Sequence, residues 1–130
     1  MWINFLTGVG KWNYAEGDTL SGIEKVIGTG WNDTFESNNV TNVFTGGAGN
    51  DIFVFRPGFS EDIVTDFAGN GAAAGDTLRF RTGIFTAFAD VMAHTSQQGS
   101  DVVIQVDASN TILLKNTLAE NLHEFDFIFG

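Results

Sequence analysis

Acidic and amide side chains recur at a fixed spacing in the first half of the chain. Asp33, Asn42 and Asp51 are nine residues apart, and each follows a short segment rich in Gly, Asn, Ser or Thr. Carboxylate and amide oxygens, together with backbone carbonyls, are the ligands that hard divalent cations prefer. The same residue types also form ordinary tight turns without any metal. The spacing therefore leaves two interpretations, a cation site and a set of solvated turns.

The overall charge and the composition exclude several classes of partner. The sequence has 16 acidic and 6 basic residues, which gives a formal net charge of −10. Such a surface repels polyanions, so we expect neither nucleic acid nor an anionic membrane as a partner. No stretch is long enough for a membrane-spanning helix, so no membrane insertion is expected. Because Cys is absent, disulfides and zinc–thiolate sites are excluded.

Catalytic residues in a known arrangement are not found in the sequence. His123-Glu124 begins like the zinc motif H-E-x-x-H, but position 127 is Phe. There is no Cys nucleophile and no G-x-S-x-G motif. We therefore expect that the chain is not an enzyme. A small lyase or epimerase site in the second half is the less favoured alternative.

A nine-residue repeat positions the acidic and amide groups. Written in nines, the sequence reads GTGWNDTFE (28–36), SNNVTNVFT (37–45) and GGAGNDIFV (46–54). The eighth place of the repeat holds Phe35, Phe44 and Phe53. A six-residue turn followed by a three-residue strand would point each Phe inward. Because one unit cannot bury its Phe alone, the repeat predicts stacked coils of two units, with turns eighteen residues apart on one edge.

The repeat resembles a known family. GGAGNDIFV matches the nonapeptide G-G-x-G-x-D-x-U-x of the RTX (repeats-in-toxin) calcium-binding proteins. The unit 28–36 matches in part, with Thr29 and Trp31 in place of two glycines. GDTLSGIEKVIG (17–28) is similar to the start of such a roll. DIVTDF (62–67) with GDTLRF (75–80) resembles the capping region of serralysin-type proteases and alginate epimerase modules.

The resemblance implies a Ca²⁺ ion between two turns that lie one coil apart. Carried over position by position, its ligands are the carbonyls of Gly28, Gly30, Gly47 and Gly49 and the carboxylates of Asp33 and Asp51. On the other edge, Asn42 and Ser37 replace Asp and Gly, so a second ion there is expected to bind weakly or not at all. Asp62 is a further candidate ligand at the end of the stack, whereas Asp76 is expected to be a turn residue.

These patterns predict one all-β domain over residues 1–130. A short parallel β-roll over about residues 1–60 is followed, over about 61–130, by a mostly antiparallel β cap with one or two short helices. The predicted elements of the cap are a helix over 85–92 capped by Thr86, a hairpin around 107–110, a helical turn capped by Thr117 and Glu120, and a last strand with Phe125, Phe127 and Phe129.

The resemblance also implies a function and a location. It implies a module that folds on binding calcium outside the cell and supports type I secretion of a Gram-negative bacterial protein. Asp126–Gly130, an acidic residue followed by apolar ones, is similar to the tail signal that type I secretion machinery reads. Met1–Gly10 lacks the pattern of a secretory signal peptide. Polysaccharide binding is the alternative, in which Trp2, Trp12 and Trp31 stack on sugars instead of packing in the core.

Overall fold

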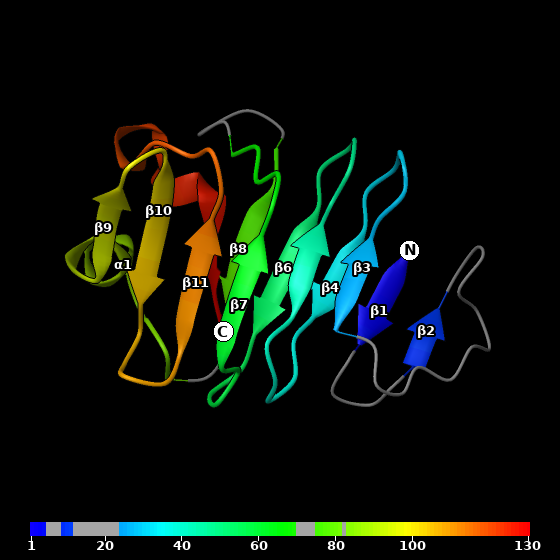
Figure 1. Ribbon diagram of the computed structural model, residues 1–130, viewed down its shortest axis with the longest axis horizontal. Coiled ribbons are helices and arrows are strands. Elements are labelled where there is room, and N and C mark those ends of the chain that lie inside the picture. The colour runs from blue at the N-terminus through cyan, green and yellow to red at the C-terminus, as the bar shows by residue number, and fades with distance from the viewer. Residues whose placement is uncertain (5–8, 12–23, 70–74, 82) are drawn as a thin grey trace.

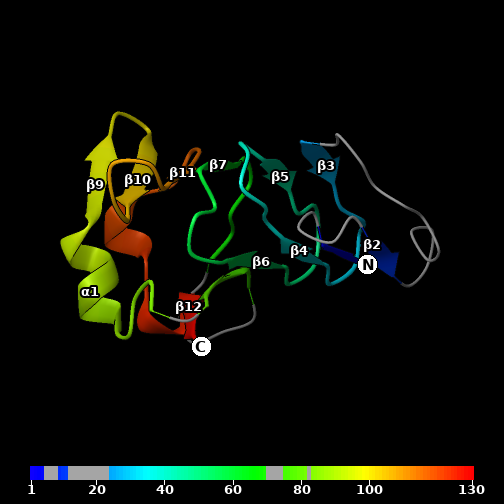
Figure 2. The same ribbon diagram turned by 90° about the horizontal axis from the view of Figure 1, so that it is seen from below.

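The computed structural model describes residues 1–4, 9–11, 24–69, 75–81 and 83–130. Trp12 and residues 17–23 of the predicted start of the roll lie outside these residues. Two six-stranded sheets face each other, and Figure 2 shows β3, β5 and β7 opposite β4 and β6. The first sheet has the order β12 (Phe127–Phe129), β8 (Thr77–Phe80), β6 (Ile52–Phe55), β4 (Thr34–Glu36), β1 (Trp2–Asn4) and β2 (Val9–Lys11). The second has the order β3 (Lys25–Ile27), β5 (Val43–Thr45), β7 (Glu61–Val64), β11 (Thr111–Leu114), β10 (Asp101–Gln105) and β9 (Thr95–Gln98).

The chain alternates between the two sheets from β3 to β8, so that two strands make one coil (Figure 1). Lys25 pairs with Val43 and Thr34 pairs with Ile52, both in parallel register and both eighteen residues apart. The predicted coil of two nine-residue units is therefore present. The same parallel stacking continues in β7 and β8, where the offsets grow to 20 residues (Val43 with Ile63) and 25 residues (Ile52 with Thr77).

Stacked phenylalanines fill the space between the two sheets. Phe35, Phe44 and Phe53 are fully buried, as the eighth place of the repeat predicts. The ring centroids of Phe35 and Phe53, one coil apart on the same sheet, are 5.5 Å apart with the rings nearly parallel. Phe44 lies 5.8 Å from Phe35 and 5.9 Å from Phe53 on the opposite sheet. Because these rings interlock, they fix which turn lies above which at the edges of the roll.

The second half prolongs both sheets of the roll. β9, β10 and β11 pair in antiparallel fashion, and β10 and β11 form the predicted hairpin. β11 then pairs in parallel with β7, and β12 pairs in parallel with β8. The fold is thus all-β with parallel strands and few helices, which confirms the predicted class. Among the described residues, no helix has the length and apolar character that a membrane crossing requires.

The two helix caps predicted for the second half are wrong. Helix α1 spans Phe88–Ala93, and its N-cap is Ala87, which makes no side-chain hydrogen bond. The Thr86 hydroxyl instead donates to Asp90 at 3.0 Å. Phe85 is buried with its ring against Phe80, and the backbone is still extended at Ala87, so the helix begins later than predicted.

The helix N-cap predicted at Thr117 is likewise one residue too early. The 3-10 turn η2 spans Ala119–Asn121 with Leu118 as its N-cap, and the Thr117 hydroxyl donates to the carbonyl of Lys115.

The last strand is also shorter than predicted, because Phe125 lies in the 3-10 turn η3 (Glu124–Asp126). The ring of His123 accepts a hydrogen bond from the Phe125 amide, and Asp126 accepts one from the His123 amide. This capping box turns the backbone away from the sheet, and the Phe125 side chain is 61% exposed. Phe127 and Phe129 remain in the strand.

Candidate metal centre

The predicted pair of turns lies on one edge of the roll. The turns 28–33 and 46–51 both lead from the second sheet to the first, and they are one coil apart. The Gly28 amide donates to the carbonyl of Thr45 at 2.7 Å, and the Ile52 amide donates to the carbonyl of Asp33 at 2.9 Å. These bonds hold the second turn directly against the first.

Glycines let the backbones of the two turns touch. A Cβ atom at Gly28 would lie 2.3 Å from the carbonyl oxygen of Gly46, and one at Gly47 would lie 2.4 Å from that of Thr29. Gly47 and Gly49 also have φ values of +91° and +106°, which other residues rarely adopt. Gly30 differs, because it is exposed and no atom lies within 4 Å of its Cβ position. Of the four predicted glycines, three therefore lie at the contact between the turns.

The Asp33 carboxylate is buried inside the first turn and has several partners. It accepts hydrogen bonds from the Thr29 amide at 2.6 Å and from the Thr29 hydroxyl at 3.0 Å. The ammonium group of Met1 lies 2.6 Å from its Oδ1. A metal ion bound through Asp33 would therefore share this carboxylate with Met1.

The Asp51 carboxylate is buried inside the second turn and has an oxygen without a partner. Its Oδ1 accepts a hydrogen bond from the Asp33 amide at 2.8 Å. Its Oδ2 is buried, and no described atom makes a hydrogen bond to it. Burial raises the pKa of Asp51 to about 6, against the effect of the Asp33 amide. The carboxylates of Asp76, Asp33 and Asp66 raise this pKa further.

Two more carboxylates, which the sequence pattern did not assign to the site, extend this edge. Asp76 is buried and accepts hydrogen bonds from the amides of Asp51 and Ala68, both at 2.9 Å. Asp66 accepts hydrogen bonds from the amides of Gly46 and Gly47, both at 2.8 Å. Asp33, Asp51 and Asp76 thus form a ladder in which the Asp33 amide donates to the Asp51 carboxylate and the Asp51 amide donates to the Asp76 carboxylate, each one coil further along. Asp76 was interpreted as a turn residue because the 25-residue offset hides its equivalence to Asp51.

Asp62, the last predicted ligand, lies on the opposite edge of the roll. Its Oδ1 accepts a hydrogen bond from the Asn42 amide at 2.8 Å, as Asp51 does from Asp33. Burial raises the pKa of Asp62 to about 8, against the lowering effects of the Asn42 amide and of the Ser37 side chain. Beside Asp62, the buried Nδ2 atom of Asn42 has no hydrogen-bond partner among the described residues. The structure therefore separates Asp62 from the pair Asp33 and Asp51.

The chemistry of the edge that carries the turns 28–33 and 46–51 suits a hard cation. In the described part of the chain, no three His, Asp or Glu side chains converge in the way that a site made of side chains alone requires. A metal ion here would take two carboxylates, from Asp33 and Asp51, and complete its shell with turn carbonyls. Such an all-oxygen set fits Ca²⁺ better than zinc or copper. The unpartnered, buried Oδ2 of Asp51 is the atom that most needs such an ion.

Comparisons with known proteins give partial matches. No family model matches the chain. Over 75 residues, or 58% of the chain, it is 28% identical to endo-1,3-1,4-beta-glycanase EglC of Rhizobium meliloti (strain 1021), of which the match covers 15%. Its structure is similar to part of the extracellular lipase LipA from Serratia marcescens, with a TM-score of 0.54 and 18% sequence identity. That match covers 85% of this chain and 20% of the lipase, so the chain spans about a fifth or less of either protein and shares with the lipase a β fold.

Proposed function

We propose that the chain is a calcium-binding module of the RTX type from a secreted bacterial protein, and that it folds when calcium binds between the turns 28–33 and 46–51. One observation carries this proposal. The Oδ2 atom of Asp51 is buried without a partner where two turns meet through glycine backbones. A buried carboxylate oxygen in this state lowers stability unless a cation or a donor satisfies it.

The charge of this edge supports a divalent ion. Asp33, Asp51 and Asp76 are buried along the ladder, and Asp66 lies beside them on the amides of Gly46 and Gly47. Like charges this close favour the unfolded chain when no cation is present. An ion that binds only the folded form stabilises it by mass action. Extracellular calcium modules bind with dissociation constants of about 10⁻⁴–10⁻³ M, so folding would follow export into a calcium-rich medium.

The position of residues 126–130 is consistent with folding after export. Phe127–Phe129 form β12, which pairs with β8, and the Gly130 amide donates to the carbonyl of Phe80 at 2.8 Å. Asp126 is buried. If Asp126–Gly130 serves as a signal for type I secretion machinery, the machinery must read it before the module folds. Calcium-dependent folding outside the cell keeps the signal accessible until export is complete.

Circular dichroism of the whole chain tests the calcium proposal. In a chelator we expect little β-structure, and on adding millimolar CaCl₂ we expect a large, reversible gain. Isothermal titration should show that Asp51→Ala weakens calcium binding more than Asn42→Ala, because Asp51 supplies a charged ligand. Glu120→Gln removes one exposed carboxylate away from the turns and serves as the control for net charge. Identical spectra with and without calcium, or equal affinities of the two alanine variants, would contradict the proposal.

A further inference from the structure

The outer face of the second sheet carries a row of apolar side chains. Four residues on adjacent strands are in register with one another, and we call them the apolar row: Val43, Ile63, Leu113 and Val103. The next residues along these strands, such as Phe44 and Ile112, are fully buried, so the alternation of a strand points the row away from the core. All four are only partly buried, and none belongs to the hydrophobic core between the sheets.

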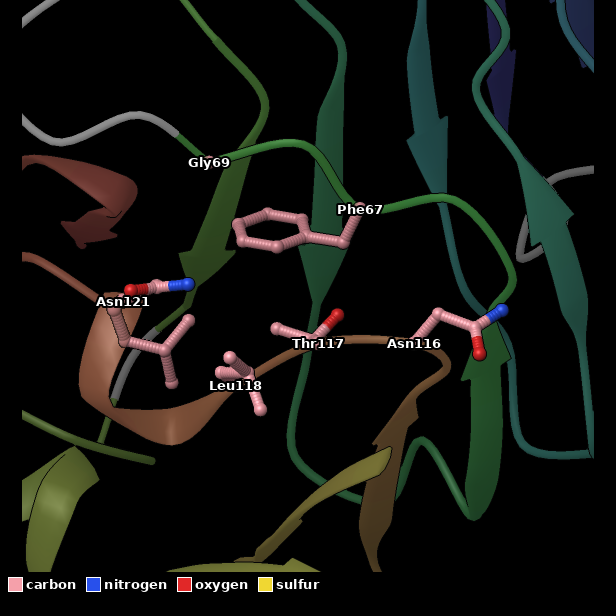
Figure 3. Close-up of a pocket in the computed structure, with 7 residues that line it drawn as sticks. Phe67, Gly69, Asn116, Thr117, Leu118 and Asn121 are labelled. Carbon is pink, nitrogen blue, oxygen red and sulfur yellow. The ribbon is translucent and has the colours of Figure 1, made fainter. Parts of the chain in front are cut away.

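No described element covers the apolar row. Figure 2 shows the second sheet with the first sheet and helix α1 on its inner side and no described helix or strand on its outer side. The pocket between Phe67 and Asn121 includes no residue of the row, so the row is uninterrupted (Figure 3). Beside the row, Ile27 is 66% exposed. A contiguous apolar patch on an otherwise charged surface is characteristic of an interaction surface.

The charge of this face differs from that of the whole chain. Its outward-pointing charged side chains are two lysines and two acids: Lys25 in β3, Lys115 directly after β11, Glu61 in β7 and Asp101 in β10. These four charges cancel, whereas the chain has a formal net charge of −10. A basic partner would be attracted to the acidic turns rather than to this face. A neutral, apolar face is what two copies of an acidic chain need in order to meet without repulsion.

We propose that the outer face of the second sheet is the interface of a dimer of this chain. With a twofold axis parallel to the strands, the strand order of one copy runs opposite to that of the other, so β7 faces β11 and Ile63 packs on Leu113 of the second copy. Lys25 then faces Ser96 of the second copy and lies diagonal to its Asp101. No side chain on this face lies opposite one of the same charge.

The size of the face predicts a weak dimer. Six strands spaced by about 4.8 Å span roughly 24 Å, and each contributes three to five residues. Interfaces that bury less than about 1,200 Å² in total belong to weak and transient complexes. We therefore expect monomers and dimers in exchange. Salt should favour the dimer, because it screens the repulsion between two acidic chains while leaving the apolar contact intact.

Sedimentation equilibrium of the whole chain in saturating calcium tests this proposal. We expect a monomer–dimer equilibrium with more dimer at about 500 mM than at about 50 mM NaCl. Leu113→Glu should raise the dissociation constant of the dimer at least about tenfold, because it places a carboxylate against the apolar row of the second copy. Leu113→Thr should raise it several-fold by removing apolar area. Ile128→Glu makes the same change of charge on the exposed side of β12 in the first sheet, so it serves as the control and should have little effect.

The outcomes separate this interface from the calcium proposal. Circular dichroism establishes first that each chain is folded, and a chain that folds without calcium is also measured in chelator, so a failed calcium site is not mistaken for a failed interface. If Leu113→Glu does not fold, Leu113→Thr decides, because Thr is well suited to strands. The proposal is overturned if the native chain stays monomeric up to millimolar concentration, if salt dissociates the dimer, or if Ile128→Glu weakens it as much as the substitution of Leu113.

Discussion

Replacing Asp51 by Asn should change stability in opposite directions with and without calcium. The substitution keeps the Oδ1 atom that accepts the Asp33 amide hydrogen bond, and it removes the negative charge. The pKa of Asp51 is raised from 3.8 to about 6, which for a fully enclosed carboxyl corresponds to roughly 3 kcal/mol of destabilisation when it is ionised. Because the neighbouring residues 47–50 are exposed, solvent screening reduces this to about 1–2 kcal/mol.

Because the pKa of Asp51 is raised, its effect on the free energy of unfolding depends on pH. A raised pKa in the folded state means that protonated Asp51 causes no loss of stability below the unfolded value of 3.8. The loss develops as the pH rises from 3.8 to about 6, and it is complete above that range. At pH 7.5 in a chelator, Asp51→Asn should therefore be more stable than the native chain by about 1–2 kcal/mol.

Calcium should make the native chain more stable than Asp51→Asn. At a calcium concentration of about 100 times the dissociation constant, the native chain gains about 2.7 kcal/mol. Asp51→Asn loses a charged ligand and should lose most of that gain, so that it becomes the less stable protein. Circular dichroism compares the folded fractions of the two proteins in chelator, where both are largely unfolded, and urea unfolding gives their free energies of unfolding in calcium. Glu120→Gln should differ little from the native chain in both conditions. If Asp51→Asn lowers stability equally in chelator and in calcium, Asp51 is an ordinary turn residue.

Three further substitutions test the roll and the cap. Gly47→Ala should destabilise by about 1–3 kcal/mol, since φ is +91° and a backbone carbonyl is in the way, whereas the exposed Gly30→Ala should be tolerated in the same urea assay. Phe53→Ala, at the fully buried centre of the ring stack, should cost about 3–5 kcal/mol by urea unfolding. Asn110→Ala should raise the pKa of Asp107, which the Asn110 side chain holds below its usual range, and NMR titration would detect the change.

The repeat could be predicted because one period sets both the core and the edge. Phe35 and Phe53 stack at the same spacing that brings Asp33 next to Asp51, so recognising the rings also places the carboxylates. Where the period is lost, the prediction weakens. Asp76 continues the ladder at an offset of 25 residues, and nothing in the local sequence distinguishes it from a turn residue.

The cap was predicted less well, because tertiary contacts override its local patterns. Phe125 alternates with two strand residues, yet the hydrogen bonds of His123 and Asp126 form a 3-10 turn that exposes it. Thr86 is a good capping residue by type, but its neighbour Phe85 is buried against another ring and the helix begins later. The pocket between Phe67 and Asn121 is lined by residues far apart in the sequence, and no motif joins them.

A single atom makes the two edges of the roll chemically different. Asn42 Oδ1 accepts the Asn38 amide, as Asp33 accepts the Thr29 amide, so the second atom of the Asn42 side chain is the donor Nδ2. A donor repels a cation where a carboxylate oxygen would attract it. On this edge Asp62, whose pKa burial raises to about 8, can remain protonated and donate a hydrogen bond of its own. The Asn42 edge can therefore relieve its buried charge with a proton, whereas in the proposed calcium module a cation does the same for the edge of Asp33 and Asp51.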